Sequence, residues 1–173
     1  MAHKRNKDYK TPKDEWQTPQ WLFDLLDQEF HFDCDAAATP DNTKCKNYLV
    51  RAFLCDDWMD ETDKVFFLNP PYSAGNIDRF MKKAMEESQK GAIVVCLVPV
   101  ASDTAWWHNY VMKADEIRFI KGRVKFIGYD KEGNQIKNSP TFSSCVVIFR
   151  EMFKKRFTPY IGKTIEQPRK VPG

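Results

Sequence analysis

The four residues Asn69-Pro70-Pro71-Tyr72 have the types and the order that best suit chemistry. Two consecutive prolines make the backbone rigid and carry no N–H, which leaves the Pro70 carbonyl able to point into a cavity. The Asn69 side chain adds a second acceptor, and Tyr72 adds a flat ring that can stack on a base. An exocyclic amino group on a planar base requires such a set, so we predict that these four residues are catalytic. A strand ending in a Pro-Pro turn beside an unrelated tyrosine is the structural alternative.

Strands and helices alternate around this motif. The apolar run 65–68 (VFFL) precedes it directly, as expected of a buried parallel strand. The motif then lies at the carboxyl end of that strand, where open α/β sheets bind their ligands. Residues 76–89 show helical spacing, and 92–98 (AIVVCLV) predict the clearest buried strand. Upstream, we expect Thr18 to be the N-cap and Pro19 the first residue of a helix.

In the second half of the chain, short strands and polar stretches replace the regular alternation of strands and helices. Residues 104–112 predict a helix, whereas 116–120 and 123–127 read as short strands. Residues 128–140 are polar, and 142–149 (FSSCVVIF) predict the last strand. We therefore expect an α/β fold with a mostly parallel sheet, closed by a β-hairpin with a reversed strand at the sheet edge.

Other short segments narrow the family. They are Trp16-Gln17-Thr18-Pro19, FDCDAAA at 32–38, Asp56-Asp57-Trp58, KGRVKF at 121–126 and the closing FSSCVVIF. With Asn69–Tyr72, residues 14–150 resemble the phage-type DNA N6-adenine methyltransferases, the small Dam-like enzymes. The resemblance implies a Rossmann-like S-adenosylmethionine-dependent methyltransferase fold, S-adenosyl-L-methionine as cofactor and double-stranded DNA as partner. It also implies site-specific, direct methyl transfer to an adenine flipped out of the duplex.

The resemblance also assigns residues to the cofactor. Thr18 and Pro19 match the element that lines its methionine end, and Asp35 matches the acid that ends the first strand. Asp57, or Asp56 in its place, matches a carboxylate that accepts a hydrogen bond from the cofactor's adenine amino group. The expected cofactor-binding residues are together Trp16, Thr18, Pro19, Asp33, Asp35, Ala36, Asp56 and Asp57.

Two features depart from the broader methyltransferase pattern. The cofactor loop reads Asp-Ala-Ala-Ala where glycines are usual, and only 29 residues, 36–64, separate it from the catalytic strand. A helical crossover alone takes about ten or more residues, so two full strand–helix units do not fit there. We therefore expect an abbreviated sheet.

Positive charge gathers at the two ends of a chain whose net charge is +3. Residues 1–14 carry five Lys/Arg against two acids, and residues 150–173 carry seven against two. Basic arms can neutralise phosphates, although two solvated termini are the alternative. We divide the chain into a basic arm (1–13), a methyltransferase domain (14–150) and a basic tail (151–173). Six further cations are expected to contact DNA or to form a solvated hairpin: Arg118, Lys121, Arg123, Lys125, Lys131 and Lys137.

Cysteines and histidines follow no metal-binding or disulfide pattern. The five cysteines form no Cys-x-x-Cys pair, which favours a reducing cytoplasm and predicts no metal. The first residues lack an apolar segment, and no apolar run is long enough to span a bilayer. We expect a cytoplasmic protein without membrane contact, inside a bacterial host if a phage encodes it. The recognition sequence and the oligomeric state stay unknown.

Two other functions stay open at this level. RNA and protein-glutamine methyltransferases also use Asn-Pro-Pro-Tyr, although the basic ends and the Trp-x-Thr-Pro segment favour DNA. A non-catalytic DNA-binding module is the second alternative, against which the intact motif argues. From the sequence alone, Asn69→Asp is expected to keep activity, because a carboxylate oxygen also accepts hydrogen bonds.

Overall fold

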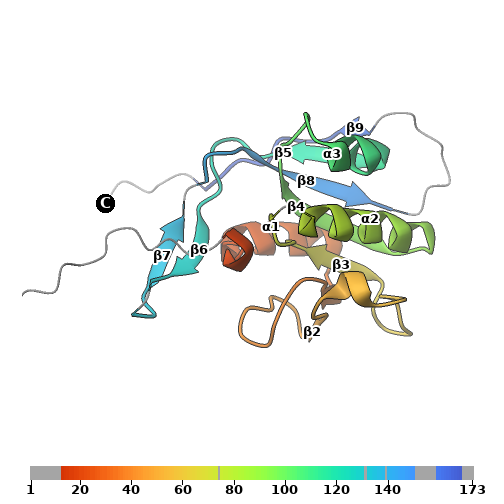
Figure 1. The fold of residues 1–173 in the computed structure, drawn as a ribbon, viewed down its shortest axis with the longest axis horizontal. Helices are drawn as coiled ribbons and strands as arrows, with labels where there is room; N and C mark the ends of the chain where they lie inside the picture. The colour runs from red at the N-terminus through yellow and green to blue at the C-terminus, as the bar shows by residue number, and fades with distance from the viewer. Residues whose placement is uncertain (1–12, 74, 131, 139, 151–158, 169–173) are drawn as a thin grey trace, which may run out of the picture.

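A seven-stranded, mostly parallel sheet forms the centre of the molecule (Figure 1). The computed structural model describes residues 13–73, 75–130, 132–138, 140–150 and 159–168. Within them the strand order is β2-β1-β3-β4-β8-β5-β9, and only the pairs that involve β8 are antiparallel. This confirms the predicted α/β class. The strands are β1 (Cys34–Asp35), β2 (Asn47–Tyr48), β3 (Val65–Leu68), β4 (Ile93–Pro99), β5 (Glu116–Phe119), β8 (Ser144–Phe149) and β9 (Tyr160–Ile161).

Helices cover both faces of this sheet. The α-helices are α1 (Gln20–Phe30), α2 (Asn76–Gln89) and α3 (Ala105–Asn109). Val95 and Leu97 of β4 pack in the core cluster of α1, whereas Val94 and Cys96 pack in the cluster of α2 and α3. Since successive residues of a strand face opposite sides, a strand covered on both faces is apolar throughout. That is why the run 92–98 carries no polar side chain.

The Asn-Pro-Pro-Tyr motif lies between β3 and α2, the two elements that the sequence predicts with the correct bounds. β3 pairs in parallel with β4 and with β1, so the carboxyl ends of three strands meet at one edge of the sheet. Gly75, with a φ of 84°, stands at the N-cap of α2. This left-handed conformation suits glycine and turns the chain from the motif into the helix.

The reversed strand does not lie at the edge of the sheet, which corrects one prediction. β8 runs between β4 and β5 and is antiparallel to both, so the expected closing pair is present. All six residues of β8 are buried. β5 and β9 lie beyond it. An uninterrupted apolar run is typical of a strand buried on both faces, which places β8 in the interior.

A second, two-stranded sheet projects from the body of the molecule (Figure 1). It consists of β6 (Phe126–Tyr129) and β7 (Gln135–Asn138), and we call it the ribbon. Its first strand starts later than the predicted 123–127, and its second lies in the polar stretch 128–140. The Asp130 carboxylate closes its turn by accepting from the backbone N–H groups of Glu132 and Asn134. Polar turn residues of this kind hide a hairpin from hydrophobic patterning.

Short elements account for the remaining differences. Residues 36–64, described throughout, hold only β2 and the 3₁₀ turn η2 (Ala52–Leu54), which confirms the absence of full strand–helix units. The predicted helix 104–112 is interrupted at Tyr110, whose φ of −125° is not helical, and continues as η3 (Val111–Lys113). A further 3₁₀ turn, η1 (Lys13–Glu15), precedes α1.

Residues 159–168 fall in the stretch that we expected to be a tail, but they join the sheet. β9 pairs in parallel with β5, and Ile165 forms a bridge with Ile120. Ile165 is buried. A two-residue strand has no periodicity to detect, so this pairing has no local signature.

Candidate active site

Asn69 follows β3 with both ends of its amide engaged. Its Nδ2 donates to the backbone carbonyl of Trp16 at 3.2 Å, and its Oδ1 accepts from the Tyr72 hydroxyl at 2.8 Å. Because a carbonyl oxygen only accepts, the Trp16 contact determines which end of the amide is nitrogen. An amide oxygen has two lone pairs, so Oδ1 keeps an acceptor position besides the one that Tyr72 occupies. Asn69 is therefore an acceptor with a defined orientation.

Tyr72 is held by both its hydroxyl and its ring. The hydroxyl lies within hydrogen-bond distance of Asn69 Oδ1 and of the Leu97 carbonyl (3.1 Å), between which its single proton is shared. Burial raises the pKa of the Tyr72 hydroxyl well above its ordinary value, so the phenol stays neutral. The ring meets Phe126 and Phe142 edge-on, with centroids 6.0 Å and 5.7 Å away. The ring therefore has a fixed orientation.

The two prolines complete the motif. Pro70 is buried and Pro71 is half-buried at the wall of the adjoining cavity. Among the described residues, no N–H or O–H donates to the Pro70 carbonyl. Neither proline has an N–H to contribute. The motif thus presents two carbonyl acceptors from consecutive residues.

A polar cavity adjoins Asn69 at the carboxyl edge of the sheet, and we call it the edge cavity. Its lining residues are Asp14, Trp16, Gln17, Thr18, Asp35, Ala37, Asn42, Lys44, Phe67, Asn69 and Pro71. Four of them also line a neighbouring cavity of about 500 Å³, whose other walls are Ala38, Thr39, Val50, Arg51, Asn76 and Phe80. The two cavities share walls and form one continuous lining, with polar groups near Asn69 and apolar side chains farther away.

Asp35 is the buried charge of the edge cavity. Its side chain is only 4% exposed, and its carboxylate accepts from the backbone N–H groups of Ala37 (3.3 Å) and Lys44 (3.1 Å). Burial raises the pKa of Asp35 to about 6, although these hydrogen bonds oppose the shift. A carboxylate with a raised pKa gains strongly from a cation beside it, because the cation restores the solvation that burial removes.

The structure brings two of the other expected cofactor residues to the edge cavity. Trp16 and Thr18 line it, and Thr18 is only 2% exposed. Pro19 is buried behind them and is the N-cap of α1, so the helix begins one residue later than predicted, without a side-chain cap. Ala36 is fully buried and donates its N–H to the Phe67 carbonyl. Ala37, the next residue, reaches the cavity instead.

Three expected cofactor residues lie elsewhere. The Asp33 carboxylate accepts from the backbone N–H groups of Lys64 and Val65, at the amino-terminal start of β3. The Asp57 carboxylate pairs with Lys90, the residue after α2. This hydrogen bond lowers the pKa of Asp57. Since α2 starts at the catalytic motif and runs back along the sheet, its end lies at the opposite edge.

Asp56 is held at the same far edge. Its backbone carbonyl accepts from Lys83 (2.6 Å) and Lys90 (3.0 Å) of the α2 region. The next residue but one, Trp58, donates its N–H to the fully buried Glu87. Lys83 also pairs with Glu87 at 2.7 Å. This network explains why the Asp-Asp-Trp segment is anchored away from the edge cavity.

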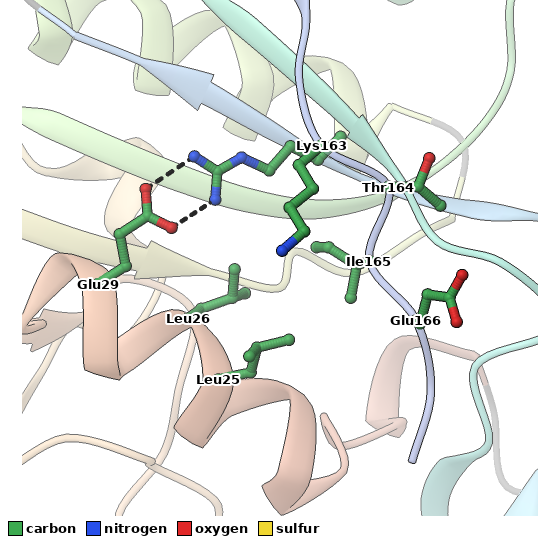
Figure 2. Close-up of a pocket in the computed structure, with 8 residues that line it drawn as sticks. Leu25, Leu26, Glu29, Lys163, Thr164, Ile165 and Glu166 are labelled. Atoms are coloured by element: carbon green, nitrogen blue, oxygen red, sulfur yellow. Dashed lines mark hydrogen bonds and ion pairs between the residues drawn. The ribbon is translucent and has the colours of Figure 1, made fainter. Parts of the chain in front are cut away.

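A second, separate cavity lies between α1 and β5, and we call it the α1 cavity. It encloses about 670 Å³, and its walls are Leu25, Leu26, Glu29, Arg118, Lys163, Thr164, Ile165 and Glu166 (Figure 2). The Arg118 guanidinium binds both oxygens of Glu29 at 2.6 Å and 2.7 Å and also contacts Glu116 at 2.6 Å. Arg118 thus has carboxylates on two sides and lies 5.5 Å from the centroid of Phe30.

The six basic residues expected to contact DNA therefore separate into groups. Arg118 is engaged as described, and Lys121 pairs with Glu166 at 3.3 Å. Arg123 and Lys125 are exposed directly before the ribbon. Lys137 belongs to β7, and Lys131 lies outside the described residues, as does the arm 1–12.

Sequence reasoning missed several residues of the edge cavity. Asp14 accepts from the backbone N–H of Ser73 at 2.8 Å and thereby ties η1 to the residue after the motif. The Lys44 ammonium donates to the side-chain oxygen of Gln20, and the Lys44 backbone N–H donates to the Asp35 carboxylate. Burial lowers the pKa of the Lys44 ammonium. Asn42 accepts from the Thr39 N–H in the same loop. The cluster Thr-Pro-Asp-Asn at 39–42 indicated a turn there, whereas no local sequence pattern indicates that Asp14 reaches the cavity.

The described residues also bear on metal binding and on membrane insertion. No group of three or more His, Cys, Asp or Glu side chains is placed to hold a metal ion there. No described helix combines the length and the apolar character needed to cross a membrane.

The fold and the site define an α/β protein with hydrogen-bond acceptors and a polar cavity at the carboxyl edge of a mostly parallel sheet. Residues 5–169 match the family DNA N-6-adenine-methyltransferase (Dam). The chain belongs to this family. The DNA N-6-adenine-methyltransferase of Haemophilus phage HP1 is 36% identical over 124 residues, 68% of this chain and 69% of the phage protein.

A second phage relative and one solved structure are also similar to the chain. The DNA N-6-adenine-methyltransferase of Escherichia phage T1 is 31% identical over 143 residues, 80% of this chain and 58% of the T1 protein. A solved structure from Listeria monocytogenes, described as a class I S-adenosylmethionine-dependent methyltransferase, is 12% identical with a TM-score of 0.39. It covers 68% of this chain and 41% of its own, a likeness too low to carry an argument.

Proposed function

We propose that the chain transfers the methyl group of S-adenosyl-L-methionine to the N6 of an adenine flipped out of double-stranded DNA. One observation carries the proposal: Asn69, which lines the edge cavity, keeps an unused acceptor position on Oδ1, and the neighbouring Pro70 carbonyl accepts from no described backbone N–H. Inside a base stack N6 cannot reach such a site, so the adenine must leave the duplex.

The residues of the two adjoining cavities suit S-adenosyl-L-methionine. Its ammonium and sulfonium need anionic neighbours, which Asp14 and Asp35 supply near Asn69. Its carboxylate needs donors, and Lys44 and Arg51 lie on the same walls. Its adenine needs an apolar wall, which Val50 and Phe80 supply farther from Asn69, in place of the contact expected of Asp57. When bound, the cofactor supplies an electrophilic methyl group.

The chain's own residues act on the amino group of the base. The free lone pair of Asn69 Oδ1 and the Pro70 carbonyl each accept one N6 hydrogen, which orients the nitrogen lone pair and makes it more nucleophilic. The neutral, fixed ring of Tyr72 stacks on the base. These groups would stabilise the positive charge that develops on N6 as the nitrogen–methyl bond forms and the sulfur–methyl bond breaks. The neutral thioether S-adenosylhomocysteine would then leave, and the methylated nitrogen would lose one proton to water. Catalysis then comes from positioning and electrostatics.

Cations before and on the ribbon would hold the DNA backbone. Arg123 and Lys125 are exposed, and no described carboxylate pairs with either. Lys131 and Lys137, between and on the two strands, would extend this basic stretch. Arg118 and Lys121 contribute less in this proposal, because Glu29, Glu116 and Glu166 already neutralise them. Such contacts position a duplex without reading its sequence.

The decisive experiment replaces Asn69 by alanine. We expect the single-turnover rate of methyl transfer to fall about 10²–10³-fold, since one oriented group at the reacting centre is lost. The cofactor Kd should change by less than about threefold, because Asn69 acts on the base; such a factor is below 1 kcal/mol. Asn109→Ala, an exposed asparagine of α3, is the matched control and should leave the rate unchanged.

The same assay separates the substrate classes. Labelled cofactor is offered with double-stranded DNA, with RNA and with protein, and the DNA product is digested to identify N6-methyladenine. Label on RNA or on protein glutamine, with DNA unlabelled, would replace the proposal by one of those activities. A wild-type rate for Asn69→Ala on DNA would remove the catalytic assignment itself.

A further inference from the structure

The catalytic amide is oriented by a residue that lies outside the catalytic motif. Asn69 Nδ2 donates to the Trp16 carbonyl at 3.2 Å, across 53 positions of sequence. Without that contact the amide can rotate and turn its NH₂ group, a donor, toward the place of Oδ1. A donor aimed at an amino group that itself donates is repulsive. The position of the Trp16 backbone therefore decides whether Asn69 presents the correct atom.

Trp16 is in turn fixed by the ribbon. Its indole stacks on Phe126, with centroids 5.5 Å apart and planes 24° apart, and on Phe142 at 6.2 Å and 28°. The next residue, Gln17, exchanges two backbone hydrogen bonds with Ile127 of β6, at 2.8 Å and 2.9 Å. The segment that carries the Trp16 carbonyl thus pairs with the ribbon as a short third strand.

A second tie links this segment to the motif. The Asp14 carboxylate accepts from the Ser73 N–H at 2.8 Å, on the far side of Tyr72. Residues 14–17 therefore contact the loop of the Asn-Pro-Pro-Tyr motif at two points, through Trp16 and Asp14, and the ribbon at two points, through Trp16 and Gln17. Phe126 also contacts the edge of Tyr72, so the ribbon meets the motif by a second route.

We propose that Trp16 is a positioning residue through which the ribbon sets the orientation of the Asn69 amide. This inference rests on the proposed role of Asn69 in methyl transfer. It differs from the cofactor-binding role that the sequence suggests for Trp16, although Trp16 lines the edge cavity. The ribbon lies directly after the exposed Arg123 and Lys125, so the element that positions the amide is also next to the proposed DNA contacts.

The experiment is a double-mutant cycle between Trp16 and Asn69. Trp16→Ala removes the stacking that holds the carbonyl, and we expect the single-turnover rate to fall about 10²-fold, as for a displacement of about 1 Å at a reacting centre. Trp16→Phe keeps a stacked ring and should recover most of the rate. In the Asn69→Ala background, Trp16→Ala should cause no further loss, because no amide remains to orient. The cofactor Kd and the DNA Kd should stay within about threefold throughout.

The ribbon is tested separately by Ile127→Pro. Proline removes the N–H that donates to the Gln17 carbonyl, whereas Ile127→Ala, the matched control, keeps it. Only the proline variant should lose rate, again with both Kd values unchanged. Thermal unfolding of each variant verifies that the chain is folded at the assay temperature.

Each outcome decides the proposal. A raised cofactor Kd with an unchanged rate for Trp16→Ala would make Trp16 a cofactor contact. Multiplying losses in the double variant would mean that Trp16 acts independently of Asn69. Equal rates for Ile127→Pro and Ile127→Ala would remove the ribbon from the proposal. If Asn69→Ala alone keeps its rate, the proposed catalytic role has failed, which is a different result from any of these.

Discussion

The edge cavity and the α1 cavity lie on the same sheet but differ in the state of their polar groups. The α1 cavity is the larger single cavity, yet its Arg118 is already bound by Glu29 and Glu116. In the edge cavity, Asp35 is buried with backbone N–H groups as its only described partners, and Asn69 keeps an unused lone pair. The larger size of the α1 cavity therefore does not make it the better candidate for a ligand site. The edge cavity is the better candidate because its polar groups keep unused hydrogen-bonding and charge capacity.

The cost of keeping polar groups incompletely paired explains the difference. Burial of the Asp35 carboxylate is destabilising, because its raised pKa shows that its two N–H partners and the attraction of Lys44 offset the burial only in part. The Arg118 cluster avoids that cost through bidentate ion pairs and through Phe30, over which Arg118 and Arg150 both lie. An incompletely paired group such as Asp35 is retained where a ligand completes its pairing. A fully paired cluster such as that of Arg118 is sufficient where the fold needs only a stable contact between α1 and β5.

The sharpest test of the edge cavity is Asn69→Asp. The sequence alone predicts a functional substitute, but a carboxylate oxygen would face the Trp16 carbonyl where Nδ2 now donates. Two acceptors repel, so the side chain should rotate away, and we expect the rate of methyl transfer to fall about 10²–10³-fold, as in Asn69→Ala. Single-turnover kinetics at saturating DNA and cofactor measure it. Activity near that of the natural chain would show that the Trp16 contact does not orient the amide.

The two opposite expectations for Asn69→Asp show which information local sequence contains and which it lacks. The apolar run 65–68 and the amphipathic segment 76–89 predicted β3 and α2 with their observed bounds, because burial imposes a period on the chain. These two predictions also placed the Asn-Pro-Pro-Tyr motif correctly, between the strand and the helix. The Trp16–Asn69 and Asp14–Ser73 contacts join residues more than 50 positions apart, and no periodicity records such a pairing.

The acidic residues illustrate the same limit. Asp35 ends a strand and reaches the cavity as expected, because the carboxyl edge collects such positions. Asp56 and Asp57 precede β3 by a loop, and contacts with Lys83 and Glu87 of α2 and with Lys90, which follows α2, determine the path of that loop. The second strand of the ribbon, β7, and β9 were missed for a related reason, since β7 follows a polar turn and the partner of β9 lies far away in the sequence.

The second prediction concerns the pH dependence that Asp35 confers. Its pKa is about 6 in the folded chain and 3.8 for the free group, so the folded state binds the proton more tightly. Without cofactor, the contribution of Asp35 is most favourable below pH 4 and is lost as the pH rises toward 6. We expect roughly 2–3 kcal/mol of unfolding free energy to be lost over this range. Denaturant unfolding at several pH values measures it.

Asp35→Asn is the control for that measurement. It removes the titrating group, so the decline between pH 4 and 6 should flatten, whatever the absolute stability of the variant. Cofactor affinity should strengthen as the pH rises through about 6 in the natural chain, because the ionised carboxylate receives a cation, and should lose this dependence in the variant. The same pH profile in both chains would contradict the assignment of Asp35.

The third prediction is made for the α1 cavity. Arg118→Met keeps an unbranched apolar stem but removes the guanidinium, which leaves Glu29 and Glu116 without their main partner. We expect the free energy of unfolding to fall by roughly 1–3 kcal/mol, the cost of losing charged hydrogen bonds at a partly buried site. The methyl-transfer rate and the DNA Kd should not change at a temperature where the variant is folded. A loss of DNA binding without a loss of stability would show that Arg118 contacts DNA.

The fourth prediction compares paired with unpaired cations. Charge reversal at Arg123 and Lys125 should weaken DNA binding and lower the slope of log Kd against log salt by about two, one for each lost phosphate contact. Reversal of Lys121, which pairs with Glu166, should change the slope less. Cofactor binding should be the same in all three chains. Equal effects of the two substitutions would mean that exposure alone decides which cations reach DNA.

The smallest expected effect is that of Asp57→Ala on the cofactor. The sequence assigns Asp57 to the cofactor's adenine, but its exposed carboxylate pairs with Lys90 at the end of α2, across the sheet from the edge cavity. An exposed ion pair adds little to stability, so the melting temperature should hardly move. The cofactor Kd should be unchanged, while Val50→Asp, which puts a charge on the apolar wall, should raise it. Calorimetric titration of both variants measures this contrast. A cofactor Kd raised only by Asp57→Ala would mean that the cofactor's adenine binds near Asp57, at the far edge of the sheet, and that the apolar wall does not contact it.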